Sequence, residues 1–448
     1  MKEFEPFRWE KDKEIPSTGL KYRIMAEDYV LKGEDGSFEA SMFSYSYLKL
    51  PVDPGRPVAF AYNGGPGSDS KWVHLGFLGP KVLKIPGYPD TKDPADAYLA
   101  DNTNCLLDTF DIVRINPAGT RYTEISDEAR GKYFGTDGDG DSFVRFICDW
   151  LKANCREKSP VYLIGESYGT IRNLVVADKL PETVDLRGIV HIGVSFNVGS
   201  KTQFFVEPNV RRLGLDAAVV WYYFHKDEMT KDEFIKEAMD FAFTDYAHAL
   251  LVGNNLSEDE KKKVAKRLSR YTNLSAEMLL EQNLRFSESD FIQNVLPDKV
   301  ISVYDARISL DKEAIDPEAG FAANEPFLRK IGTRIDDCMT GYEKELVLPK
   351  GRKEVGLYEI AGKWDYASYK KDTLRLSEEL MKKRPSLRMV FVNGYYDTLS
   401  TFDFILFLLS QLDLPKDRVT TRFYESGHTV YVGDPTDELI DDIRNFVK

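Results

Sequence analysis

The sequence predicts an α/β fold, with a central, mostly parallel sheet, helices on both of its faces, and a helical cap inserted into it. Short apolar segments alternate with helix-like segments up to about residue 200, and the alternation returns after residue 357. Such alternation indicates a parallel sheet that is buried on both faces. Residues 209–294 between these parts are charged and mostly helix-like, as in "KDEFIKEAMDFAFTDYAHALL". We therefore expect a core of residues 1–204 and 346–448 and a mainly helical cap of residues 205–345.

The individual elements follow from local patterns. Residues 20–50 predict a β-hairpin, because partly alternating segments flank the turn "KGEDG". Further strands are expected at residues 57–65, 110–119, 160–169, 186–197, 387–397 and 419–428. Helices of the core are expected at residues 141–155, 170–180, 369–384, 402–412 and 435–448.

Composition excludes several classes of protein. The chain has 448 residues, of which 42% are hydrophobic and 30% charged, as in globular proteins. Its net charge of -13 argues against nucleic acid or an anionic membrane as a partner. The four cysteines form no disulfide framework, and the charged N-terminus shows no signal peptide. These features favour a cytoplasmic location, although a secreted protein whose leader had been removed would look the same.

The sequence also argues against a bound cofactor. The segment "DGDGDSF" begins like a calcium-binding loop, but Ser142 and Cys148 stand where that loop needs glycine and glutamate. A glycine-rich loop before a helix is enough to explain it. The chain has no zinc, nucleotide or flavin motif either, so we expect no metal and no cofactor.

The segment "YLIGESYGTIR" places Ser167 between two glycines at the end of an apolar strand. The pattern G-x-S-x-G is typical of a sharp turn from strand to helix that exposes a nucleophilic serine. Alternatively, Gly165 and Gly169 are ordinary turn residues and Ser167 caps the helix that follows. The rest of the chain has to decide between these readings.

Two later segments supply the partners that a nucleophilic serine needs. Asp397 follows one apolar strand and His428 follows the next, each on a loop. The order serine, acid, histidine at successive strand ends is that of a catalytic triad in hydrolases of this architecture. Of the five histidines, His428 is the only one in the required position. These partners favour the nucleophile reading of Ser167.

A fourth segment, "YNGGPGSDSKW", follows an early strand. Glycines there let the backbone approach a substrate, so that its N–H groups can stabilise an oxyanion. Taken alone, the segment also fits a plain Gly-Pro turn.

Together these segments resemble the serine carboxypeptidase family, in particular its bacterial branch. The resemblance covers about residues 57–200 and 357–432 and rests on "NGGPGSDSKWVHLGFLGP", "INPAGT", "DGDSFVRFICDWL", "SPVYLIGESYGT", "YEIAGKWDY", "VNGYYDTLS" and "FYESGH". It implies an α/β-hydrolase fold and hydrolysis of the C-terminal bond of a peptide substrate.

The resemblance also implies residue roles. Ser167 would be the nucleophile, His428 the general base and Asp397 the carboxylate that orients it. The backbone N–H groups of Gly65 and Tyr168 would form the oxyanion hole. The substrate's carboxylate would be bound by Asn63, Gly64 and Glu166. Because two carboxylates repel, Glu166 would have to be protonated when it binds that carboxylate.

The sequence departs from the family at several positions. Phe77 stands where many members carry a second glutamate that shares this proton. We therefore expect a flatter pH profile that reaches nearer to neutral. Ser68 replaces a family cysteine, which removes a disulfide expected of secreted members. Asn116 and Arg121 also differ, and are expected to reshape the pocket.

Two other functions stay open at this point. The same triad serves esterases and acyltransferases, and a fold does not decide chemistry. A binding protein on a retired hydrolase fold is the non-enzymatic alternative, but the presence of all three triad residues argues against it. The sequence predicts neither peptide specificity nor oligomeric state.

Overall fold

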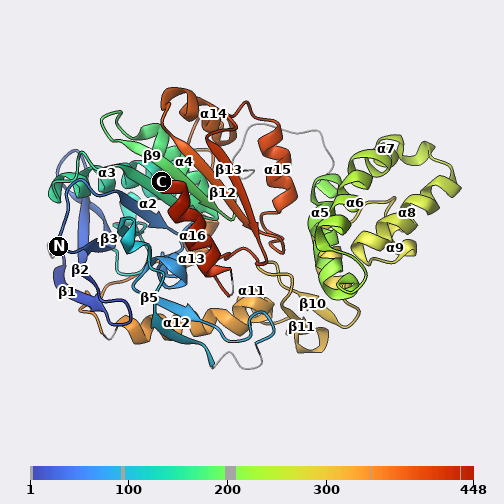
Figure 1. Cartoon of the computed structure of the whole chain (residues 1–448), viewed down its shortest axis with the longest axis horizontal. Coiled ribbons are helices and arrows are strands. Elements are labelled where there is room, and N and C mark those ends of the chain that lie inside the picture. Colours follow the sequence, from blue (N-terminus) through green and yellow to red (C-terminus); the bar gives the residue numbers. More distant parts are fainter. Residues whose placement is uncertain (1–3, 92–95, 197–207, 344, 434) are drawn as a thin grey trace.

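In the computed structural model, which describes residues 4–91, 96–196, 208–343, 345–433 and 435–448, a nine-stranded sheet forms the centre of the molecule (Figure 1). Its strand order is β1-β2-β3-β7-β4-β8-β9-β12-β13. The strands are β1 Arg8–Ile15, β2 Leu20–Lys32, β3 Phe38–Lys49, β4 Val58–Tyr62, β7 Asp111–Asn116, β8 Val161–Glu166, β9 Leu186–Ile192, β12 Arg388–Gly394 and β13 Val419–Tyr424. Neighbours from β7 to β13 are parallel, whereas β1, β2, β3 and β7 pair antiparallel. This is the α/β-hydrolase fold that the sequence predicts.

Two apolar cores lie on the two faces of the sheet. Successive residues of β8 show the alternation, since Leu163 packs into one core and Ile164 into the other. The helices of the first core are α3 Thr136–Ala153, α4 Tyr168–Lys179, α14 Thr373–Lys383 and α15 Phe402–Ser410. The second core is covered by η1 His74–Leu78, α12 Thr333–Glu343 and α16 Thr436–Val447.

Short elements complete this part of the chain. They are α1 Lys71–Val73, β5 Lys81–Lys84, β6 Tyr98–Asp101, η3 Leu106–Asp108, α2 Asp127–Tyr133, β10 Lys299–Ile301, β11 Ser309–Asp311, η7 Lys312–Ala314, α11 Phe321–Asn324, η8 Leu328–Gly332 and α13 Leu357–Gly362. Strands β5 and β6 pair with each other, as do β10 and β11.

A helical cap extends from one side of the sheet (Figure 1). Its elements are α5 Pro208–Val220, η4 Trp221–His225, α6 Lys231–Phe241, η5 Ala242–Tyr246, α7 Ala247–Val252, η6 Gly253–Asn255, α8 Glu258–Thr272, α9 Ala276–Glu281 and α10 Glu288–Asn294. A third apolar core lies in the cap and also includes Tyr396 and Phe402 from the sheet part of the chain. The cap is joined to the sheet layer where the Leu215 N–H donates to Asp403 Oδ2 at 3.1 Å, which ties α5 to α15.

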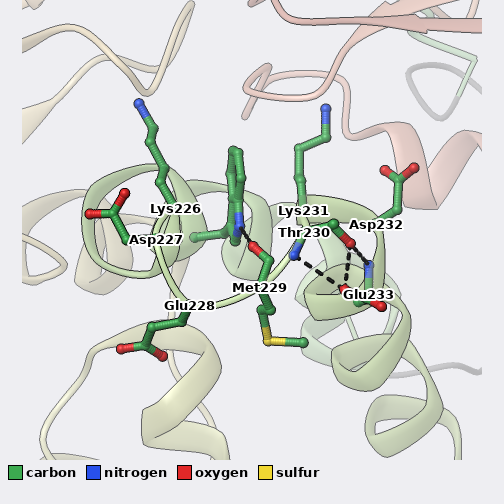
Figure 2. A pocket seen from close by; sticks show the side chains of 9 residues that line it. Lys226, Asp227, Glu228, Met229, Thr230, Lys231, Asp232 and Glu233 are labelled. Atoms are coloured by element: carbon green, nitrogen blue, oxygen red, sulfur yellow. Dashed lines mark hydrogen bonds between the residues drawn. The ribbon is translucent and has the colours of Figure 1, made fainter.

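The turn between η4 and α6 borders a hollow of about 660 Å³ on the cap (Figure 2). Trp221 Nε1 donates to the Met229 carbonyl at 2.8 Å. Thr230 and Glu233 form a capping box at the start of α6. The side chains of Lys226 and Lys231 extend together to the side away from Met229 (Figure 2). None of the residues with a predicted role lines this hollow.

Two differences from the expected elements have a clear physical reason. Strand β1 was not predicted, because its residues are charged and mostly exposed, as an edge strand allows. The prediction of a glycine-rich loop before a helix is wrong, since residues 136–142 already belong to α3. A Cβ at Gly138 would overlap the Lys132 carbonyl, and one at Gly140 would crowd Val175. These glycines therefore allow close packing and do not break the helix.

The expected boundary between residues 204 and 205 lies outside the described residues. At the other boundary, Phe327, Ile335, Met339 and Leu346 pack into the core beneath the sheet and not into the core of the cap. All four cysteines are free thiols. No helix in the described ranges is long and apolar enough to cross a membrane.

Candidate active site

The turn from β8 to α4 holds Ser167 in a strained backbone conformation, with φ 57° and ψ −126°. Contact requires glycine at position 165, because a Cβ at Gly165 would overlap the Gly169 carbonyl, and a Cβ at Gly169 would be tight, at 3.2 Å from the Tyr62 carbonyl. Ser167 precedes α4, but its side chain makes no capping hydrogen bond. The reading of Ser167 as an ordinary N-cap therefore fails, and the geometry is that of a nucleophile turn.

Asp397 and His428 meet at the ends of neighbouring parallel strands. Asp397 follows β12 and His428 follows β13, and His428 Nδ1 lies 2.8 Å from Asp397 Oδ2. The other carboxylate oxygen, Oδ1, accepts the N–H groups of Leu399 and Ser400 at 2.9 and 3.0 Å. Both side chains are buried. The carboxylate is thus fixed on one side by its own loop and on the other by the imidazole.

Room for the imidazole comes from a glycine after β9. A Cβ at Gly193 would lie 2.9 Å from His428 Cε1, and the φ of Gly193 is +61°. The backbone N–H of His428 donates to the Tyr304 carbonyl at 2.6 Å, which holds the loop that carries His428 in place. Burial lowers the pKa of His428, but the charge and hydrogen bond of Asp397, helped by Glu166, outweigh it and raise the pKa to about 9.

Asn63, Gly64 and Glu166 form a polar cluster beside Ser167. Asn63 Nδ2 donates to Glu166 Oε2 at 2.7 Å, and Asn63 Oδ1 accepts the Val73 N–H at 3.1 Å. A Cβ at Gly64 would overlap the Tyr168 nitrogen, so only glycine lets this loop approach the nucleophile turn. Gly65, which has φ +100°, also lines the cleft at Ser167. Of the two predicted oxyanion residues, Tyr168 follows Ser167 in the chain and Gly65 lines the same cleft as Ser167.

Glu166 is almost fully buried, and its burial raises its pKa above the ordinary value of 4.5, against the opposing charge of His428. Its Oε1 lies 3.8 Å from His428 Nε2. The two groups are close enough for the protonation of one to change the pKa of the other. The carboxyl and the imidazole therefore titrate as a coupled pair.

Tyr431 belongs to the cluster and was missed in the sequence. Its hydroxyl accepts a hydrogen bond from Asn63 Nδ2 at 3.2 Å, and its ring packs against Phe77 with centroids 5.1 Å apart. Burial raises the pKa of Tyr431 well above its ordinary value of 10, so it is neutral in the physiological range. Phe77 thus packs against the ring of Tyr431, whose neutral hydroxyl lies next to Asn63. Tyr431 lies three residues after His428, and that proximity is the signal that could have found it.

A buried ion pair behind the nucleophile was also missed. Arg172 on α4 donates to both carboxylate oxygens of Asp139 on α3, at 2.7 and 3.1 Å. Its third hydrogen bond goes to the Asn63 carbonyl at 2.7 Å. The guanidinium also lies 4.5 Å from the centroid of the Phe143 ring. Arg172 therefore ties the loop that carries Asn63 to the helix that starts beside Ser167.

Asn116 and Arg121, which are expected to reshape the pocket, do not line the cleft themselves. Asn116 is buried, accepts the Ser70 N–H at 3.0 Å and donates to the Arg121 carbonyl at 2.6 Å. Ser70 Oγ in turn accepts the Asn63 N–H at 3.2 Å. Their influence on the site is thus indirect, through the backbone of Asn63. Ser68, in contrast, lies in the lining.

The cleft has a volume of about 780 Å³. Its lining includes Asn63, Gly65, Glu166, Ser167 and His428, which we call the inner wall. It also includes Phe321, Phe327, Leu328, Leu357 and Tyr358, which we call the outer wall. Phe327 stacks on Trp72 with ring centroids 5.6 Å apart. The described residues contain no group of three or more His, Cys, Asp or Glu side chains that could bind a metal.

Comparisons with known proteins find only weak similarities to solved structures. No protein-family model and no curated protein matches the chain. Among solved structures it is similar to a proline iminopeptidase from Mycobacterium smegmatis, at 10% identity over 94% of this chain and 97% of that chain, with a TM-score of 0.38. It is also similar to an esterase from Pyrococcus furiosus (10% identity, 94% and 90%, TM-score 0.37) and to MenH from S. aureus (14% identity, 91% and 97%, TM-score 0.35). Similarities this weak carry no argument about chemistry, which has to come from the site.

Proposed function

We propose that this protein is a serine hydrolase that releases C-terminal amino acids from peptides through an acyl-enzyme on Ser167. The observation that carries the proposal is the cluster of Asn63, Gly64 and Glu166 directly beside Ser167. A general esterase needs the triad but no group that binds a free carboxylate of its substrate. A hydrolase that binds a free carboxylate does need such a group, and Glu166 can serve as one provided that it is protonated.

In this mechanism Ser167 Oγ attacks the scissile carbonyl and His428 Nε2 takes the hydroxyl proton, while Asp397 stabilises the resulting imidazolium. A hydrogen bond from Ser167 Oγ to His428 Nε2 has to form when substrate binds, as catalytic contacts often do only in the complex. The backbone N–H groups of Gly65 and Tyr168 donate to the oxyanion. His428 then passes the proton to the leaving amino acid, and water, activated by the same imidazole, hydrolyses the acyl-enzyme.

Because Glu166 and His428 titrate as a coupled pair, the mechanism requires a fixed number of protons on the pair. The productive enzyme has one proton on the pair, on Glu166, so that Glu166 can donate to the substrate carboxylate and His428 is free to act as a base. A carboxylate bound beside Glu166 favours this arrangement, because it penalises a second negative charge there. Substrate binding and activation of the base are therefore linked through one proton.

The test compares release of free amino acid from acetyl-blocked dipeptides with hydrolysis of p-nitrophenyl esters. We expect the wild-type protein to release the amino acid, Ser167→Ala to release none, and Glu166→Gln to raise KM for the peptide more than it changes ester turnover. Ester turnover that depends on Ser167, without any peptide turnover, would support the alternative of an esterase or acyltransferase. A serine-directed fluorophosphonate that fails to label Ser167 would instead support a retired binding protein.

A further inference from the structure

A second hollow, of about 710 Å³, lies next to the cleft at Ser167. It is lined by residues of α10, of β10 and the loop after it, and of the segment from η7 to α11. Phe321 and Leu399 line both the hollow and the cleft. Both are large apolar side chains that are 55% and 46% exposed. The two spaces are therefore adjoining, with an apolar boundary that both share.

The hollow is mainly apolar. Its apolar lining consists of Ile292, Val300, Ile301, Val303, Ile315, Phe321, Pro326 and Leu399. The buried Glu325 is already satisfied, since its carboxylate accepts hydrogen bonds from Ser302 Oγ, the Val303 N–H and the Leu328 N–H. Lys312 donates to the Pro297 carbonyl at 2.9 Å. A ligand here would therefore gain from burying apolar surface and would meet few polar groups that need a new partner.

The direction of a bound peptide follows from the proposed function, on which this step rests. If the C-terminal carboxylate lies at Asn63 and Glu166, every additional residue extends the substrate from the acyl side of the scissile bond. None of the residues proposed to bind the carboxylate lines the second hollow. A chain that leaves the cleft past Phe321 and Leu399 would thus bring a side chain from upstream of the scissile carbonyl into the hollow.

We propose that this hollow is a binding subsite for an apolar side chain of the peptide, located one or more residues before the residue that supplies the scissile carbonyl. The substrate class is then peptides of three or more residues with an aliphatic or aromatic residue upstream. Dipeptides fill only the cleft at Ser167 and are poorer substrates.

The experiment measures kcat/KM for acetyl-Phe-Leu, acetyl-Ala-Phe-Leu, acetyl-Leu-Phe-Leu and acetyl-Leu-Ala-Phe-Leu, by release of free leucine. The small acetyl block keeps the blocking group itself from occupying the hollow. We expect at least one of the two peptides with an upstream leucine to exceed acetyl-Ala-Phe-Leu by roughly 10-fold, as for other apolar specificity pockets. In Ile315→Asn, which places a polar group in the lining, we expect this preference to disappear and hydrolysis of acetyl-Phe-Leu to stay unchanged.

Leu251→Asn is the matched control, because Leu251 is an apolar cap residue that is 85% exposed and does not line the hollow. It should keep the preference for upstream leucine. Equal rates for the alanine and leucine peptides in the wild type, with acetyl-Phe-Leu still hydrolysed, would overturn the subsite and leave the proposed function standing. If Ile315→Asn keeps the preference for upstream leucine, the subsite is likewise overturned and the proposed function stands. Failure to hydrolyse any of the four peptides would overturn the proposed function, and the subsite with it.

Discussion

The two walls of the cleft at Ser167 are built in different ways. The residues of the inner wall stand at or beside the ends of strands of one parallel sheet, and hydrogen bonds fix several of them, as in Asn63 to Glu166 and His428 to Asp397. The outer wall comes from residues 321–358 and presents exposed apolar side chains, such as Tyr358 at 65% and Phe321 at 55% exposure. The comparison suggests that the inner wall performs the chemistry and the outer wall selects the substrate.

The largest effect on kcat is expected when the nucleophile of the inner wall is removed. Ser167→Ala should lower kcat by a factor of about 10⁶ for peptides and esters alike, and Asp397→Asn by about 10⁴, because the imidazole then loses its orienting carboxylate. Steady-state kinetics with both substrate types measures this. If Asp397→Asn kept near wild-type kcat, Asp397 would not be the carboxylate that orients the base.

The second effect concerns the support behind the inner wall. Arg172→Met leaves Asp139 as an unpaired charge in a buried position, and we expect a loss of about 3–5 kcal/mol in the free energy of unfolding. Urea denaturation measures it. Arg187→Met is the control, since the ion pair of Arg187 with Asp185 is exposed and worth at most about 1 kcal/mol. Similar losses in both variants would contradict the role of Arg172.

The third prediction uses pH. The pair of Glu166 and His428 has to hold one proton, so kcat/KM should fall at low pH, where both are protonated, and at high pH, where neither is. The acidic limit of kcat/KM lies above pH 4.5, the ordinary pKa of a glutamate, because burial raises the pKa of Glu166. The alkaline limit lies near the pKa of His428, about 9. The optimum should therefore lie near neutral, and a sharp maximum at pH 4–5 would contradict the account.

Glu166→Gln sharpens the same test. Glutamine cannot lose a proton, so the alkaline limb should disappear. Loss of the neighbouring negative charge should also lower the pKa of His428, so the remaining acidic limb reports the protonation of His428 alone. A pH profile that keeps both limbs in this variant would show that other groups control the rate.

A smaller effect is expected from Tyr431. Tyr431→Phe removes the hydroxyl that accepts from Asn63, so KM for peptides should rise several-fold while ester turnover stays constant. Tyr369→Phe is the control, because this buried tyrosine donates to Asp178 and does not line the cleft. An equal rise in KM in both variants would mean a general packing effect.

The smallest effect should come from the outer wall. Tyr358→Ser removes an exposed aromatic ring from the lining and should change the relative kcat/KM of two peptides by less than about 10-fold, with ester turnover unchanged. A competition assay with two peptides in one mixture resolves such a change. A large loss of ester turnover would instead assign this wall a part in the chemistry.

The same comparison explains what the sequence could predict. The fold and the positions of Ser167, Asp397 and His428 follow from local patterns, since each residue lies at or shortly after the end of a strand and parallel strands end at one edge. The strained turn at Ser167 is also local, because Gly165 and Gly169 mark it.

Long-range packing could not be predicted in this way. The contact of Tyr431 with Asn63 and that of Arg172 with Asp139 join segments far apart in the chain, and single residues give no periodic signal. Strand β1 was hidden by its charges, which an exposed edge tolerates. The outer wall is formed by residues 321–358. Their sequence shows helix-forming residues, but it does not show the surface against which these residues pack.

The central claim is that the cluster beside Ser167 binds a free carboxylate, and one pair of substrates tests it most directly. The measurement is kcat/KM for acetyl-Phe-Leu and for its C-terminal amide, with cleavage of the Phe-Leu bond as the readout in both. We predict that the free acid is preferred by at least about 10-fold in the wild type, and that Glu166→Gln reduces this preference. Equal rates for the acid and the amide, unchanged in Glu166→Gln, would contradict the claim.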